Sequence, residues 1–298
     1  MAARDWWKLA RGVNVLMGAI TVPVGALIVG AAGQSDTIVS IDLHTISVAT
    51  FMAGWNTLND LEDIEADIVN HPDRPLAKGT IDIPSAKNFY RAMMAVSFLS
   101  LLAIVGLHDG GPQGFGWLDS VLIWMTALIL MYSYEYDGMP FNPCLKRRGL
   151  AGNLSVSGLI AVVIVFGASA VDSGLSPLPW SVALCAMMIG TAREIVKDIE
   201  DMGGDEGRDT LPMKVGAEKA RITVWVFTFI SFITIGLPFA LDLFPLPFIG
   251  FMGPAIFYLL LVKGPIAKGE DTKASKYLKR ALLFGLLGFT ACGVVPYL

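Results

Sequence analysis

The sequence has few charged residues. Of its 298 residues, 16% are Asp, Glu, Lys or Arg, whereas a soluble globular domain carries about 25%. Together with 54% hydrophobic residues and a mean hydropathy of +0.60, this composition excludes a soluble enzyme. The formal net charge of -4 neither predicts a nucleic-acid partner nor excludes an anionic substrate. We therefore expect no nucleic acid among its partners, and the sequence gives no sign of an obligate protein partner.

Cysteine is also scarce, with only Cys144, Cys185 and Cys292 in the chain. They lie far apart, form no CxxC pair and have no histidines at ligand spacing. The sequence therefore predicts neither a zinc site nor a disulfide framework.

Long apolar runs are abundant. Nine runs are long enough to cross a hydrocarbon core as helices, and their continuous apolar character excludes the alternating strands of a membrane barrel. The sequence therefore predicts an all-α integral membrane protein, a single domain over residues 1–298 with nine transmembrane helices around a central cavity. The predicted spans are 13–32, 38–59, 89–107, 117–136, 150–171, 178–197, 222–241, 244–262 and 280–298.

The basic residues mark one side of this membrane protein. All 22 Lys and Arg residues fall in or beside the N-terminal segment and the connections after spans 2, 4, 6 and 8. By the positive-inside rule, the N-terminus and these connections face the cytoplasm and the C-terminus lies outside. We expect a multi-pass protein of the cell membrane.

The acidic residues concentrate in two of the cytoplasmic connections. At about 100° per residue, Asn56, Asp60, Asp63 and Asp67 fall within an arc of about 60° on one helix, and we call Asp60, Asp63 and Asp67 the first array. The same DxxDxxxD spacing recurs 138 residues later, after span 6, as Asp198, Asp201 and Asp205, which we call the second array. The repeat predicts two four-helix halves plus one further helix, with both arrays facing the shared cavity.

Carboxylates stacked on one helix face repel each other unless a cation lies among them. Oxygen ligands without His or Cys favour Mg²⁺ or Ca²⁺, and Mg²⁺ is the usual ion at a phosphate site. The interleaved bases Arg74, Arg193, Lys197 and Arg208 then favour a bound diphosphate between the arrays. For a single array, a solvated acidic surface is the simpler interpretation; the duplicated spacing favours the metal site.

Other polar residues have two interpretations each. Asn14, inside the first apolar run, lines a polar pocket or hydrogen-bonds another helix. Tyr132 and Tyr134 stabilise a carbocation or contact the diphosphate, or they are ordinary interfacial aromatics. The run of Lys146, Arg147 and Arg148 anchors anionic lipid headgroups or attracts a phosphorylated acceptor.

At the two arrays the sequence resembles the UbiA-type intramembrane prenyltransferases, whose hallmark is NDxxDxxxD after the second helix and a second Asp-rich motif after the sixth. The matching stretches are NDLEDIEAD at residues 59–67 and DIEDMGGD at 198–205. Within the family, VNHPDRPLAKGTI at 69–81, and REIVKD at 193–198 followed by TLP at 210–212, look most like the archaeal geranylgeranylglyceryl-phosphate geranylgeranyltransferases.

The resemblance implies that the six aspartates of the two arrays are the catalytic residues and bind Mg²⁺ and diphosphate, with Asn56 and Asn59 assisting. It also implies that Arg74 and Lys197 contact the diphosphate and that the substrates are an isoprenyl diphosphate donor and a lipid-phosphate acceptor drawn from the membrane lipid. The reaction would alkylate the free hydroxyl of geranylgeranylglyceryl phosphate. The substrate-binding candidates are Asn14, Asn56, Asn59, Arg74, Lys78, Tyr132, Lys146, Arg193 and Lys197.

The sequence departs from the family pattern at three places. Residues 11–14 read RGVN instead of RPxN, the link from Glu135 to Cys144 is longer than usual, and Lys78 adds a charge that can bind the acceptor phosphate. An aromatic, quinone-precursor or chlorin acceptor would use the same diphosphate chemistry. A cation-coupled transporter is the alternative of another class, although transport sites lie near the bilayer midplane and the middles of the nine spans lack ionisable side chains.

Overall fold

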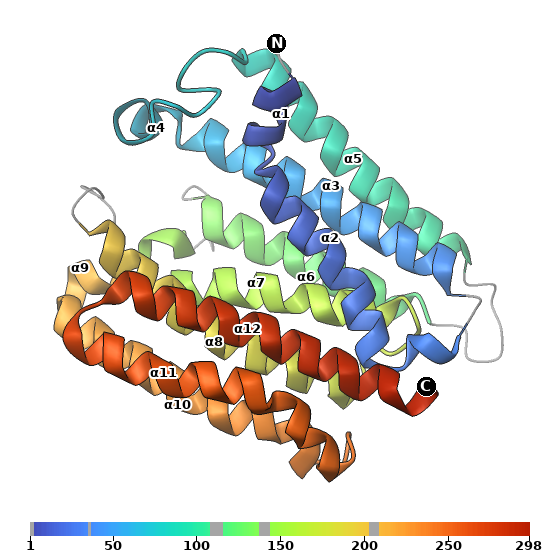
Figure 1. Cartoon of the computed structure of the whole chain (residues 1–298). Helices are drawn as coiled ribbons and strands as arrows, with labels where there is room; N and C mark the ends of the chain where they lie inside the picture. The colour runs from blue at the N-terminus through green and yellow to red at the C-terminus, as the bar shows by residue number, and fades with distance from the viewer. Residues whose placement is uncertain (1–2, 35–36, 108–115, 137–143, 203–208) are drawn as a thin grey trace.

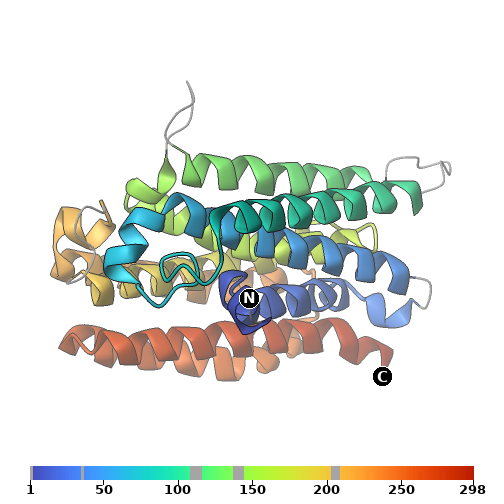
Figure 2. The same cartoon turned by 90° about the horizontal axis from the view of Figure 1, so that it is seen from above.

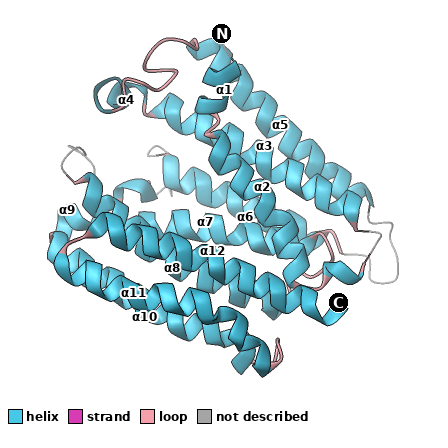
Figure 3. Cartoon of the chain, in the orientation of Figure 1, coloured by secondary structure: helices cyan, strands magenta, loops and turns pink. Residues whose placement is uncertain are grey.

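A computed structural model describes residues 3–34, 37–107, 116–136, 144–202 and 209–298 of the chain, and every regular element within them is helical (Figure 3). Nine α-helices in these ranges have 16 residues or more. They are α2 (Gly12–Ile28), α3 (Ile38–Glu62), α5 (Ile83–Leu107), α6 (Leu118–Glu135), α7 (Leu150–Ser169), α8 (Pro177–Asp201), α10 (Ala217–Ala240), α11 (Gly253–Lys268) and α12 (Asp271–Val294). The short α-helices are α1 (Ala3–Leu9), α4 (Ile64–Asn70) and α9 (Leu211–Val215), and the 3₁₀ turns are η1 (Ala31–Gly33), η2 (Leu145–Arg147), η3 (Leu246–Met252) and η4 (Val295–Tyr297).

The all-α prediction is confirmed, and one long helix overlaps each predicted apolar run. Within the described ranges, six helical segments are long and apolar enough to cross a membrane, and a seventh is added if α1 and α2, which meet at 64°, form one bent span. α6 and α8 are outside this set, and the last turns of α8 carry the charged residues Arg193 to Asp201. α12 begins at Asp271 rather than at residue 280, because its polar first turns are helical although they lie outside the apolar run.

The contacts between the long helices follow chain order around a closed ring. Each packs against the next, and α12 closes the ring on α2. Other contacts cross the ring: α2 packs against α7, α8 packs against α12, and α3 makes a smaller contact with α7. The first cross contact depends on small residues, since a Cβ at Gly25 would lie 2.2 Å from the Ile164 carbonyl oxygen and one at Gly167 would lie 2.1 Å from that of Val22.

One end of the ring carries the charged elements. α4 and α9 lie at the same end of the bundle in both views, and the C-terminus lies at the opposite end (Figures 1 and 2). Within the bundle, the buried His44 bonds the Ser40 carbonyl and the Ser120 hydroxyl. The charged end of the bundle is therefore where both arrays could bind one ligand.

Candidate functional site

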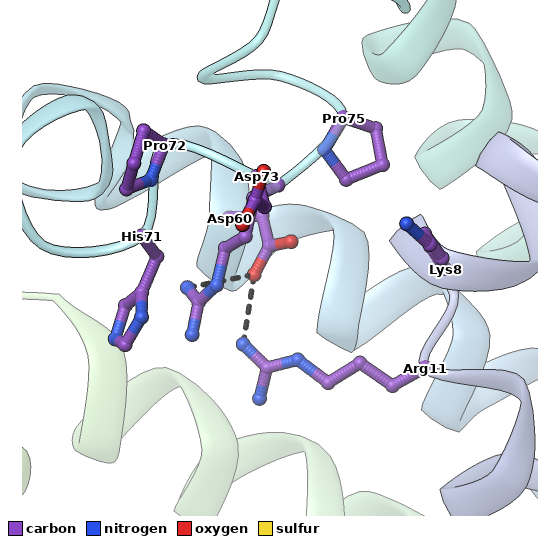
Figure 4. Close-up of a pocket in the computed structure, with 8 residues that line it drawn as sticks. Lys8, Arg11, Asp60, His71, Pro72, Asp73 and Pro75 are labelled. Atoms are coloured by element: carbon purple, nitrogen blue, oxygen red, sulfur yellow. Dashed lines mark hydrogen bonds and ion pairs between the residues drawn. The ribbon is translucent and has the colours of Figure 1, made fainter.

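The first array begins with Asp60, which is 2% exposed in the last turn of α3. Its Oδ1 accepts hydrogen bonds from Arg11 Nη2 at 2.7 Å and from Arg74 Nη1 at 3.3 Å. Figure 4 shows Arg11 reaching the Asp60 carboxylate from the N-terminal segment of the chain. A buried carboxylate needs such partners, because an unpaired buried charge is costly.

The helix carrying the first array is bent at Asp63. The prediction of one continuous helical stripe is wrong here, since α3 ends at Glu62 and α4 begins at Ile64. Two i to i+4 hydrogen bonds nevertheless cross the bend, from the Asp63 N–H to the Asn59 carbonyl and from the Asp67 N–H to the Asp63 carbonyl. They keep Asp67 close to the other two aspartates of the array. Arg74 Nη1 donates to Asp67 Oδ2 at 2.6 Å as well as to Asp60.

Asp63 belongs to a second polar cluster, which also contains Lys146, Glu135 and the neutral amide of Asn59. Lys146 Nζ lies 3.0 Å from Asp63 Oδ1 and also donates to Glu135. Asn59 Nδ2 lies 3.2 Å from both Asp63 Oδ2 and Glu135 Oε2, while its Oδ1 accepts from Arg11. Burial alone would lower the pKa of Lys146, but its bond to Glu135 and the charges of Glu135 and Asp63 outweigh burial and raise that pKa. Lys146 is therefore a cation at neutral pH.

Glu135 was missed as a site residue by the sequence analysis, which noted it only as the start of a long link. Its side chain is fully buried and lies at the C-terminal end of α6. A buried carboxylate at the end of a span resembles an ordinary loop residue in the sequence, so its position there carried no signal.

A pocket of about 360 Å³ opens beside Asp60 (Figure 4). Three bases line it, Lys8, Arg11 and Arg74, and the segment from His71 to Pro75 forms another part of its wall. Lys8 and Arg11 were not among the predicted site residues: both were used for membrane topology, and Arg11 was otherwise noted only as part of RGVN. Convergent cations in a concave site favour an anion with several oxygens, because charge-assisted hydrogen bonds are among the stronger ones.

The described aspartates of the second array, Asp198 and Asp201, lie on α8, which packs beside α7. Asp198 Oδ2 accepts a 2.8 Å hydrogen bond from Asn153 Nδ2, and Asp201 is exposed at the last position of the helix. Glu194 Oε1 pairs with Lys197 at 2.7 Å and with Arg193 at 3.1 Å. Asp205 and Arg208 lie outside the described residues.

One short segment contacts both arrays. Lys146, in η2, pairs with Asp63 of the first array, and Asn153, in the first turn of α7, bonds Asp198 of the second. Residues 146–153 therefore connect the two arrays at this end of the bundle.

The remaining predicted residues are spread around this end. Asn56 Nδ2 donates to the Ala10 carbonyl, which ties α3 to the end of α1. The Tyr132 hydroxyl lies 3.3 Å from that of Tyr90, and its ring meets Trp55 edge-on. Asn14 and Lys78 are exposed, in the first turn of α2 and in the turn before α5.

The oxygen atoms that the two arrays offer as ligands suit a hard divalent cation chemically. Both arrays offer carboxylate oxygens, and Asn153 Oδ1 is a buried oxygen without a hydrogen-bond partner beside Asp198. In the described part of the chain, no three His, Cys, Asp or Glu residues are already grouped closely enough to hold a metal. In the first array the carboxylates are neutralised instead by Arg11, Arg74 and Lys146.

The chain is similar to known proteins over nearly its whole length. Residues 19–286 match the UbiA prenyltransferase family. A digeranylgeranylglyceryl phosphate synthase of Methanosarcina mazei is 30% identical, covering 97% of this chain and 98% of that protein. A solved structure from work on digeranylgeranylglyceryl phosphate synthase in membranes is 26% identical with a TM-score of 0.74, covering 98% of each chain. A solved UbiA homologue from Archaeoglobus fulgidus bound to GPP and Mg²⁺ is 18% identical with a TM-score of 0.68, covering 96% of this chain and 99% of that one.

Proposed function

Because the chain belongs to the UbiA prenyltransferase family, we propose that it transfers a geranylgeranyl group from geranylgeranyl diphosphate to the free hydroxyl of geranylgeranylglyceryl phosphate. The family and the synthase relatives make it a multi-pass membrane enzyme that transfers prenyl groups. The product would carry the second ether bond of an archaeal membrane lipid. The observation that carries the proposal is the convergence of two acidic arrays and several bases at one end of the bundle.

The donor's diphosphate is the ligand that this charge pattern suits. Lys8, Arg11 and Arg74 line one pocket, and Lys146 lies on the other side of the first array at Asp63. A diphosphate entering this pocket would replace carboxylates as the partners of Arg11 and Arg74. Arg193 and Lys197 lie beside the second array, and each of them is paired with the carboxylate of Glu194.

The six aspartates Asp60, Asp63, Asp67, Asp198, Asp201 and Asp205 would hold Mg²⁺. When bound, Mg²⁺ neutralises the charge that develops on the diphosphate as the allylic C–O bond breaks. The solved homologue that carries GPP and Mg²⁺ supports this assignment. In this chain the aspartates would exchange Arg11, Arg74 and Lys146 for the metal, and the released bases would then be available to donate hydrogen bonds to the diphosphate.

The acceptor's hydroxyl oxygen would form the new ether bond to C1 of the prenyl group and lose its proton, while diphosphate leaves. Asn14, Asn56, Asn59 and Lys78 are candidates for binding the substrates. Tyr132, edge-on to Trp55 and close to Tyr90, presents an aromatic ring that can stabilise positive charge on the allylic carbon. Apolar walls around the site would keep water from that cation.

The membrane arrangement follows from the same proposal. The nine long helices would be nine spans, two four-helix halves plus one, around a cavity in a single domain over residues 1–298. The N-terminus and both arrays would face the cytoplasm and the C-terminus the outside of the cell membrane, since the arrays share their end of the bundle with Lys8, Arg11, Arg74 and Lys146.

An acceptor competition tests the substrate. Purified protein receives geranylgeranyl diphosphate and Mg²⁺ with equal amounts of geranylgeranylglyceryl phosphate, 4-hydroxybenzoate and a chlorin, and the products are separated by mass spectrometry. We expect the ether of the glyceryl phosphate to dominate by at least tenfold, about 1.4 kcal/mol in transition-state free energy. A preference for the aromatic acceptor or the chlorin would contradict the lipid assignment.

A further inference from the structure

Four buried polar atoms without a partner lie on α7, α8 and the start of α9. In the described ranges, five buried side-chain nitrogen or oxygen atoms lack a hydrogen-bond partner. One is the indole nitrogen of Trp55, on α3. The other four are Asn153 Oδ1, Ser157 Oγ, Arg193 Nε and Thr210 Oγ1. Leaving such an atom unsatisfied costs about 1 to 3 kcal/mol, so the one that lies beside the second array, Asn153 Oδ1, needs a physical reason.

Asn153 is the member that contacts the array itself. It is 7% exposed, and its Nδ2 donates to Asp198 Oδ2 at 2.8 Å. The orientation of the amide is fixed by chemistry, because an ionised carboxylate only accepts hydrogen bonds and so must face the NH₂ group. The Oδ1 atom therefore points away from that bond while remaining buried.

The corresponding amide of the first array is fully engaged. Asn59 Oδ1 accepts from Arg11 at 2.7 Å, and its Nδ2 donates to Asp63 and Glu135. Both asparagines thus hold an array aspartate through the NH₂ group, but only Asn59 has a cation on its oxygen. The amide oxygen of Asn153 has the chemistry to take a cation in the same way, and neutral amide oxygens are ordinary ligands of hard divalent ions.

We propose that Asn153 Oδ1 is a ligand of the divalent cation held by Asp198. This assignment rests on the proposed function, since it concerns the metal of the same site, and it adds a neutral ligand from α7 to the carboxylates of α8. Asn153 then has two tasks: its NH₂ group orients Asp198 and its oxygen binds the ion.

Mn²⁺ titration followed by electron paramagnetic resonance tests the assignment on purified protein without prenyl substrate. We expect Asn153→Ala to weaken binding at one site by about 10-fold or more, the usual scale for losing a group that supports a metal site. Ser157→Ala is the matched control, because Ser157 is equally buried on α7 and also has an unpartnered oxygen, but it faces Gly190 instead of Asp198. The control should titrate like the unchanged protein.

A second variant separates ligation from a structural role of the amide. Asn153→Cys places a thiolate, which prefers soft metals, at the ligand position. With Cd²⁺ it should show a thiolate-to-metal charge-transfer band that Ser157→Cys lacks. The proposal is overturned if Asn153→Ala binds Mn²⁺ as tightly as the control, or if Asn153→Cys binds Cd²⁺ without the band.

Neither titration uses a prenyl substrate, so its outcome is independent of turnover. Failure of the transferase proposal would appear as a protein that binds Mn²⁺ but forms no product. Failure of the Asn153 assignment would appear as normal Mn²⁺ binding by the alanine variant in an enzyme that is active.

Discussion

Replacing either Asp63 or Asp201 by alanine is expected to lower turnover by about 10³-fold or more, while the protein still folds and inserts. Metal ions contribute several kcal/mol of charge stabilisation in the transition state, and about 4 kcal/mol corresponds to three orders of magnitude. The two residues lie in different arrays, so the result tests whether both arrays are needed. Diphosphate release from geranylgeranyl diphosphate at saturating Mg²⁺ is the measurement.

The local structure explains why these variants should fold. Lys146 still pairs with Glu135 when Asp63 is removed, and Asp201 is exposed at the end of α8. Glu65→Ala is the matched control, because Glu65 is an exposed acid in the first turn of α4, between Asp63 and Asp67. Near-normal activity of either aspartate variant would contradict the two-array account.

The second large effect is on stability. Lys146→Met should destabilise the protein by about 3 to 5 kcal/mol, the scale for removing one partner of a buried ion pair. Glu135 has a fully buried side chain and would lose its cation, and among the described residues the amide of Asn59 would remain as its side-chain partner. Unfolding in detergent, followed by circular dichroism as denaturant is added, measures the change.

A double-mutant cycle provides the control for that prediction. Glu135→Gln removes the charge that Lys146→Met would strand, so the double variant should recover much of the loss. If the two single changes simply add, Glu135 and Lys146 do not stabilise each other, and the ion pair has no part in holding the first array.

Local patterns allowed much of the molecule to be predicted from its sequence. The helix positions followed from apolar runs, and the first array followed from the spacing of Asp60, Asp63 and Asp67. The bend at Asp63 did not follow, because periodicity describes a straight helix, and two i to i+4 hydrogen bonds continue across the bend. The start of α12 was misplaced because hydrophobicity locates the apolar core of a span and not its polar extension.

Contacts between distant residues were the part that sequence patterns could not supply. Arg11 meets Asp60 across 49 positions, Lys146 meets Asp63 across 83, and Glu135 meets Asn59 across 76. Only the folded ring brings these residues together. The repulsion among the aspartates was recognised correctly, but in this structure the bases of the chain itself relieve it.

The most direct test of the central claim is the metal dependence of ether formation by the purified enzyme. Geranylgeranyl diphosphate and geranylgeranylglyceryl phosphate are incubated with the protein after chelation of divalent ions, and again after Mg²⁺ is restored, with the product measured by mass spectrometry. The account predicts no digeranylgeranylglyceryl phosphate without the metal and full recovery with it. Equal product formation under both conditions, or none with Mg²⁺ present, would contradict it.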